Sequence, residues 1–116
     1  MAKLHFRYGA MNAGKTTIML QTAYNYEERN QKVLIIKPSI DTKGNEKVVS
    51  RIGLRRDVDA LISPDDSIFD RIGNCLDITN CILVDEAQFL SKSQVDELYY
   101  ITKLYNIPVI AFGLRT

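Results

Sequence analysis

Residues 9–16 read Gly9-Ala10-Met11-Asn12-Ala13-Gly14-Lys15-Thr16 and match the pattern G-x-x-x-x-G-K-[ST] of a phosphate-binding loop. A strand-like segment at 3–8 precedes this stretch, and apolar residues at near-helical spacing follow it. Between a strand and a helix, the backbone N–H groups of such a loop form an anion-binding nest. The sequence therefore predicts a nucleoside triphosphate as the ligand of residues 9–16.

The residue types within the loop suit that ligand. Gly9 and Gly14 let the backbone turn tightly and approach phosphate oxygens closely. The ammonium group of Lys15 is expected to reach the β- and γ-phosphates, and the hydroxyl of Thr16 is expected to bind Mg²⁺. The alternative is an ordinary glycine-containing turn between a strand and a helix, and a second motif argues against it.

The second motif is an acidic pair at the end of an apolar run, Ile82-Leu83-Val84-Asp85-Glu86. This is the Walker B pattern, in which Asp85 is suited to hold Mg²⁺ directly or through water. Glu86, beside it, is suited to take the proton from an attacking hydroxyl group. The alternative is that both are solvated acids at a strand end.

Apolar runs alternate with helix-like segments along the chain. We expect strands at about 3–8, 33–36, 81–84 and 109–112, and helices at about 16–30, from the cap Ser63 to Gly73, and from the capping box at 91–94 to Tyr105. The polar stretch 41–59 is expected to be a long loop with room for a short hairpin.

This order predicts an α/β fold of the P-loop NTPase (RecA-like) type, with a mostly parallel sheet of four to five strands flanked by helices. Ligands bind such sheets at the carboxyl ends of the strands. We therefore expect the glycine loop and the acidic pair to form one site.

Composition limits the function classes. The chain has 116 residues, 46% hydrophobic and 25% charged, with a net charge of +1. These values favour one folded domain and give no indication of a nucleic-acid or membrane partner. Cys75 and Cys81 lack the spacing of a zinc site, so no zinc site is expected within the chain. No export signal is evident, and a cytoplasmic location with reduced thiols is expected.

Five stretches together resemble a known enzyme family, the bacterial type II thymidine kinases related to the human cytosolic enzyme. The matching stretches occur in family order and cover essentially the whole chain: 9–17, 37–41, 50–54, 84–90 and 113–116. The resemblance implies that residues 1–116 are the nucleotide-binding core of an enzyme that transfers the γ-phosphate of ATP to the 5′-hydroxyl of thymidine, with Mg²⁺. It also implies a homotetramer.

The resemblance assigns roles to individual residues. The catalytic base is Glu86. ATP is bound by the loop residues Gly9, Ala10, Met11, Asn12, Ala13, Gly14, Lys15 and Thr16 and by Asp85, Glu86, Ala87 and Gln88, with Mg²⁺ at Thr16 and Asp85. The nucleoside pocket is lined by Met11, Asp41, Phe89 and Leu114. Residue type alone allows other interpretations. Met11 could fill a gap in the core, and Phe89 could be the apolar residue that leads into a helix. Asp41 could be a solvated loop residue, and Gln88 a surface amide.

Two departures from the family pattern affect the expected activity. Lys43 stands where the family usually has arginine, and lysine lacks the planar bidentate fork. The chain also stops at Thr116, ahead of the segment in which the family carries a zinc-binding subdomain and a lasso-like loop over the thymine. We therefore expect this chain to bind ATP–Mg²⁺ and to phosphorylate thymidine weakly or not at all. A P-loop ATPase module and a non-catalytic nucleotide-binding domain are the alternative functions.

Overall fold

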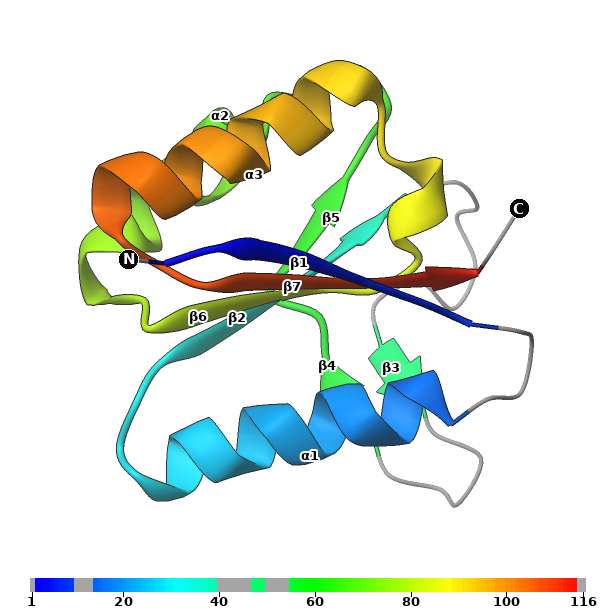
Figure 1. Ribbon diagram of the computed structural model, residues 1–116, viewed down its shortest axis with the longest axis vertical. Coiled ribbons are helices and arrows are strands. Elements are labelled where there is room, and N and C mark those ends of the chain that lie inside the picture. The colour runs from blue at the N-terminus through cyan, green and yellow to red at the C-terminus, as the bar shows by residue number, and fades with distance from the viewer. Residues whose placement is uncertain (1, 10–13, 40–46, 50–54, 115–116) are drawn as a thin grey trace.

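A central sheet of parallel strands organises the protein (Figure 1). The computed structural model describes residues 2–9, 14–39, 47–49 and 55–114. The strands of this sheet are β1 (Leu4–Gly9), β2 (Val33–Pro38), β5 (Ala60–Ile62), β6 (Cys81–Val84) and β7 (Val109–Leu114), in the order β1-β7-β6-β2-β5. Every neighbouring pair in that order is parallel. The predicted α/β fold with a mostly parallel sheet is confirmed.

Helices cover both faces of the sheet (Figure 1). One face carries α1 (Lys15–Glu28), and the opposite face carries α2 (Ile68–Ile72) and α3 (Lys92–Tyr105). Two short 3₁₀ helices are also present, η1 (Gly73–Ile78) after α2 and η2 (Ala87–Phe89) after β6. Among the described residues, no helix has the length and apolar character needed to span a lipid bilayer.

The strand alternation divides the core into two apolar clusters. Leu34 and Ile36 of β2 point into the cluster beneath α2 and α3, whereas Val33 and Ile35 point into the cluster beneath α1. All four of these side chains are buried, which explains why the central strands are continuous apolar runs.

The outermost strand β1 departs from its predicted burial. Its alternation predicts one less buried face, but the side chains from His5 to Tyr8 are all exposed. Phe6 and Tyr8 stack on each other with ring centroids 5.6 Å apart, and they are 37% and 46% exposed. β1 lies at one end of the strand order, and the exposure of these side chains shows that the helices leave its faces open to solvent there.

The predicted short hairpin in the polar stretch is confirmed, but the stretch contains more structure than expected. β3 (Lys47–Val49) and β4 (Arg55–Asp57) pair as antiparallel strands. β5 then joins the main sheet beside β2, and no strand was predicted there. A strand of three residues is too short for its periodicity to be recognised.

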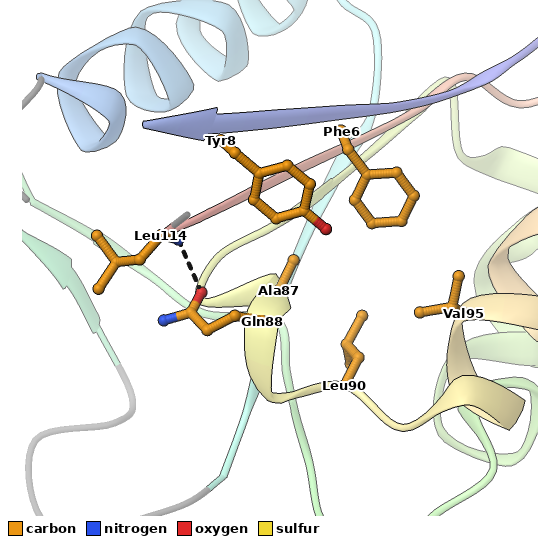
Figure 2. Close-up of a pocket in the computed structure, with 7 residues that line it drawn as sticks. All are labelled: Phe6, Tyr8, Ala87, Gln88, Leu90, Val95 and Leu114. Carbon is orange, nitrogen blue, oxygen red and sulfur yellow. Dashed lines mark hydrogen bonds between the residues drawn. The ribbon is translucent and has the colours of Figure 1, made fainter. Parts of the chain in front are cut away.

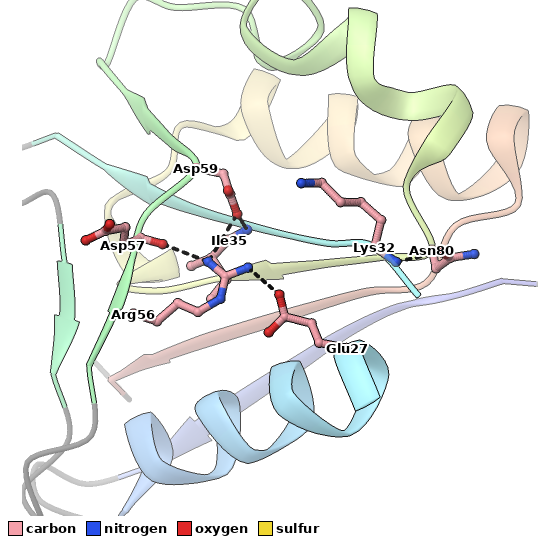
Figure 3. A network of polar contacts seen from close by, with 7 residues as sticks. All are labelled: Glu27, Lys32, Ile35, Arg56, Asp57, Asp59 and Asn80. Carbon is pink, nitrogen blue, oxygen red and sulfur yellow. Dashed lines mark hydrogen bonds and ion pairs between the residues drawn. The ribbon is translucent and has the colours of Figure 1, made fainter. Parts of the chain in front are cut away.

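Arg56 fixes the hairpin to the rest of the fold (Figure 3). Its guanidinium lies 3.0 Å from a carboxylate oxygen of Glu27 on α1 and 3.5 Å from one of Asp59. The same oxygen of Asp59 accepts a hydrogen bond of 2.7 Å from the backbone N–H of Ile35 on β2. The Arg56 side chain is only 15% exposed, so this network is partly shielded from solvent.

The predicted helix start at Ser63 was wrong. The N-cap of α2 is Ser67, whose Oγ accepts from the N–H of Asp70. Residues 63–66 form a turn instead, in which the N–H of Ser63 donates to the Asp66 carboxylate at 2.8 Å. Glu97 of α3 also accepts from the backbone N–H groups at the start of α2. Contacts from another helix thus decided the boundary, and local sequence does not contain them.

The predicted capping box at the start of α3 is confirmed. Its Gln94 also hydrogen-bonds to the turn formed by residues 63–66. Its side-chain oxygen accepts from the N–H of Ser91 at 3.0 Å, and its nitrogen donates to the carbonyl oxygens of Ser63 and Asp66 at 2.9 and 3.0 Å. The residue is 2% exposed. Gln94 is therefore a buried polar group with its hydrogen bonds made.

The substitution Gln94→Met keeps the side-chain volume but removes these hydrogen bonds. We expect it to lower the free energy of unfolding by about 1 to 3 kcal/mol, because it leaves buried polar groups without partners. Urea denaturation measures this. The matched control is Gln21→Met at an exposed position of α1, and equal unfolding midpoints for the two variants would contradict the role given to Gln94.

Candidate functional site

The described residues of both sequence motifs lie at one edge of the sheet. Because the five strands are parallel, their carboxyl ends meet at that edge. β1 ends at Gly9, which pairs with Leu114 of β7, and β6 ends at Val84, directly before the acidic pair. β7 is the one strand between them in the sheet order.

The described end of the glycine loop passes directly into α1. Gly14 is the N-cap of this helix and has a φ of 76°, in the left-handed region that favours glycine. Lys15 and Thr16 open the helix and are partly buried. The first backbone N–H groups of a helix have no partner within it, which favours an anion at this end. Ala10, Met11, Asn12 and Ala13 lie outside the described residues.

Charges from both motifs act on Asp85. Burial raises the pKa of the Asp85 carboxyl, and the negative charge of Glu86 raises it further. The positive charges of Lys37 and Lys15 act in the opposite direction. Lys15 at the start of α1 and Lys37 near the end of β2 both lie on the side of the sheet at which the acidic pair follows β6. Lys37 was not among the residues predicted for this site, although its position near the end of β2 was a usable signal.

The donor set suits a magnesium ion that arrives with a nucleotide. Mg²⁺ prefers oxygen ligands, and in phosphate sites one or two protein oxygens suffice because phosphates and water supply the rest. The Thr16 hydroxyl and the Asp85 carboxylate come from the two segments that face this edge. Among the described residues there is no group of three or more His, Cys, Asp or Glu able to hold a metal by itself. The residues present fit a metal carried by a triphosphate.

Glu86 has a constrained backbone. Its φ of 56° lies in the left-handed region, which is unfavourable for a residue with a side chain. Its N–H donates to the Asp85 carboxylate at 3.0 Å, and its carbonyl oxygen accepts from the N–H of Phe89 at 3.1 Å. These contacts hold an unfavourable conformation at a candidate catalytic residue, as functional sites often do.

Gln88 links Glu86 to the end of β7. Its side-chain nitrogen donates to the Glu86 carboxylate at 3.3 Å, and its side-chain oxygen accepts from the backbone N–H of Leu114 at 3.1 Å. Figure 2 shows the second of these hydrogen bonds. Gln88 is partly buried, whereas residue type alone suggested a surface amide.

A pocket of about 390 Å³ lies beside this network (Figure 2). It is lined by Phe6, Tyr8, Ala87, Gln88, Leu90, Val95 and Leu114. Of the residues expected around a nucleoside, only Leu114 is in this lining, while Phe89 is 45% exposed and absent from it. Asp41 and Met11 lie outside the described residues, as do Lys43 and its neighbours up to residue 46.

The two cysteines are free thiols in different surroundings. Cys81 is buried at the start of β6, where burial raises the pKa of its thiol to about 11. Cys75 is partly exposed. A thiol with a raised pKa is a poor nucleophile at neutral pH, so Cys81 is a core residue.

The backbone strain at Glu86 can be measured by comparing Glu86→Gly with Glu86→Ala. Both variants lose the carboxylate, but glycine adopts a φ of 56° without the steric cost. We expect the glycine variant to have a free energy of unfolding about 1 kcal/mol higher than the alanine variant. At the helical control position Gln21 the order is reversed, with alanine more stable by about 1 kcal/mol. Chemical denaturation of the four variants tests this, and an alanine variant as stable as glycine at position 86 would contradict it.

Comparison with known proteins agrees with this geometry. The family model described as thymidine kinase matches residues 2–116. The chain is 48% identical to the thymidine kinase of Coxiella burnetii, 46% to that of Rhodopirellula baltica and 46% to that of Enterobacteria phage T4. Each match covers 100% of this chain but only 61%, 56% and 61% of the respective relative, so the chain spans about three fifths of their length. The chain belongs to the thymidine kinase family.

Proposed function

We propose that this chain is the nucleotide-binding core of an enzyme that transfers the γ-phosphate of ATP to the 5′-hydroxyl of thymidine. The observation that carries the proposal is that the parallel sheet brings the start of α1, with Lys15, and the acidic pair after β6 to the same edge. The thymidine specificity is supported by the relatives, which are thymidine kinases. A cytoplasmic homotetramer is part of the same proposal and is supported by the family resemblance.

In this proposal, the triphosphate lies along residues 9–16 at the start of α1. Lys15 contacts the β- and γ-phosphate oxygens, and the backbone N–H groups of the loop bind the remaining negative charge. Thr16 and Asp85 hold the Mg²⁺ ion, which neutralises charge on the phosphates when it is bound. Ala87 and Gln88 belong to the ATP-binding segment that begins at Asp85.

Glu86 acts as the base in this proposal. Phosphoryl transfer depends mostly on positioning and charge neutralisation. A carboxylate that accepts the proton of the attacking hydroxyl accelerates the reaction further. Glu86 follows the proposed Mg²⁺ ligand Asp85 directly in the sequence, and the proposal has its carboxylate face the phosphates. Asp85, which is partly buried at the end of β6, is assigned to the metal in this proposal.

The nucleoside binds on the β7 side of this edge in the proposal. Leu114 is the last residue of β7 and lines the pocket. Phe89 is the last residue of η2, the short helix that follows the acidic pair in the sequence. Met11 and Asp41 complete the proposed nucleoside pocket. Apolar and aromatic groups suit a thymine ring, which presents a methyl group and two flat faces.

Two variants separate phosphate binding from transfer. In the protein as its gene encodes it, Lys15→Ala should weaken ATP binding by about 10- to 100-fold, because it removes a charged hydrogen-bond donor. Glu86→Gln should keep ATP binding and lower the rate of thymidine phosphorylation by about 100- to 10,000-fold. Calorimetry and a coupled ADP assay measure these quantities.

The control for Lys15 is Lys32→Ala, at an exposed position just before β2, away from the carboxyl ends of the strands. It should leave ATP binding unchanged. Normal phosphate transfer by Glu86→Gln would show that another group is the base. Normal ATP affinity in Lys15→Ala would place the triphosphate elsewhere.

The polypeptide of residues 1–116 alone should bind ATP–Mg²⁺ and transfer phosphate to thymidine slowly. Tyr8 and Phe89, at the pocket and beside the acidic segment, are 46% and 45% exposed, so water has access to this region. Transfer to a nucleoside requires that water be excluded from the reacting phosphate. We expect a turnover far below the roughly 1 to 100 per second of ordinary kinases. Turnover within that range, measured with radiolabelled thymidine, would contradict this expectation.

A further inference from the structure

We propose that Gln88 is a positioning residue that holds the carboxylate of Glu86 toward the phosphate-acceptor site. This inference rests on the proposed function, in which Glu86 is the base, and gives Gln88 a role beyond the ATP-binding segment. Gln88 hydrogen-bonds to Glu86 and to Leu114 through the two different ends of one amide.

The chemistry of the amide fixes its orientation. The backbone N–H of Leu114 can only donate, so the atom of Gln88 that faces it at 3.1 Å must be the oxygen. The nitrogen must then point the other way, where it finds the Glu86 carboxylate at 3.3 Å. A carboxylate can only accept, so both hydrogen bonds are made in one orientation and lost in the other.

The close approach of Gln88 to β7 requires glycine at position 113. A Cβ atom added there would lie 2.8 Å from the Gln88 side-chain oxygen and 3.2 Å from its backbone nitrogen. The first distance is shorter than real Cβ contacts, and the second involves the main chain, which cannot move away easily. Gly113 thus provides the space in which the Gln88 amide sits against the strand.

Glu86 needs such a support. Among the described residues, the bond from Gln88 is the one hydrogen bond that its carboxylate makes. The other contacts of Glu86 fix only its backbone, in the left-handed region. Without Gln88 the side chain would be free to rotate, and a base displaced by about 1 Å can lose on the order of 100-fold in rate.

The same amide couples the base to the proposed nucleoside pocket. Leu114 lines the pocket, and its backbone N–H is the group that orients Gln88. A movement of the end of β7 would therefore turn the amide and shift Glu86 with it. The position of the base thus depends on the strand that bears a nucleoside contact.

The variant Gln88→Glu tests the inference in the protein as its gene encodes it. Glutamate has the same length and keeps an oxygen for the N–H of Leu114, but it replaces the donor to Glu86 with a second acceptor. We expect kcat to fall by about 10- to 100-fold, with KM for thymidine within about twofold of the unaltered protein. The matched control Gln21→Glu, at an exposed position of α1, should retain kcat.

A double-mutant cycle distinguishes positioning from a purely structural role. If Gln88 acts through Glu86, then Gln88→Glu costs nothing further once Glu86→Gln has removed the carboxylate. If Gln88 only braces β7 or contacts ATP, the loss of kcat is the same in both backgrounds, and the inference is overturned. Single-turnover measurements determine the slow transfer rates of the variants that carry Glu86→Gln.

Gly113→Ala provides a second, independent variant. It displaces the Gln88 amide without changing its chemistry, and it should lower kcat by a similar factor while ATP binding is retained. Retention of kcat in both Gln88→Glu and Gly113→Ala would overturn the role of Gln88 while leaving the proposed function intact. An unaltered protein that does not phosphorylate thymidine would overturn both.

Discussion

Parallel pairing of β1, β7 and β6 is the constraint on which the candidate site depends. Because these strands run in the same direction, the chain leaves β1 at Gly9 and β6 at Val84 on one side of the molecule. Two segments about 70 positions apart in the sequence thereby face a common space. The charge of Lys15 acts on Asp85 as a result. Antiparallel pairing at either position would send one motif to the opposite edge.

The burial of both sheet faces maintains this pairing. The central strands place alternate side chains into the cluster under α1 and into the cluster under α2 and α3, and most of their residues are buried. A slip of one residue would exchange the two sets, so the register is strongly specified. The candidate site residues can therefore adopt less stable conformations, as Glu86 does, because the strand before it is held by the core.

The sequence predicted the parts of the fold that local patterns encode. The buried strands, α1 and α3, and the capping box at Ser91 follow from apolar periodicity and cap residues, and the glycine loop and acidic pair follow from spacing. The start of α2 was missed because Glu97, 30 positions from Ser67, helps to set it. The Gln88 link to Leu114 spans 26 positions, and the exposure of β1 depends on strand order. Contacts between distant segments have no local signature, so these features required the structure.

A direct measurement of the shared site is the paramagnetic broadening of backbone amide signals by Mn²⁺–ATP. Mn²⁺ replaces Mg²⁺ beside the phosphates, and broadening falls steeply with distance from the ion. The account predicts strong broadening at Lys15, Thr16, Asp85 and Glu86 together, and little at Asn80 and Asn106, which precede β6 and β7 at the opposite edge. Broadening of only one of the two motifs, or of the opposite edge, would contradict the claim that they bind one triphosphate.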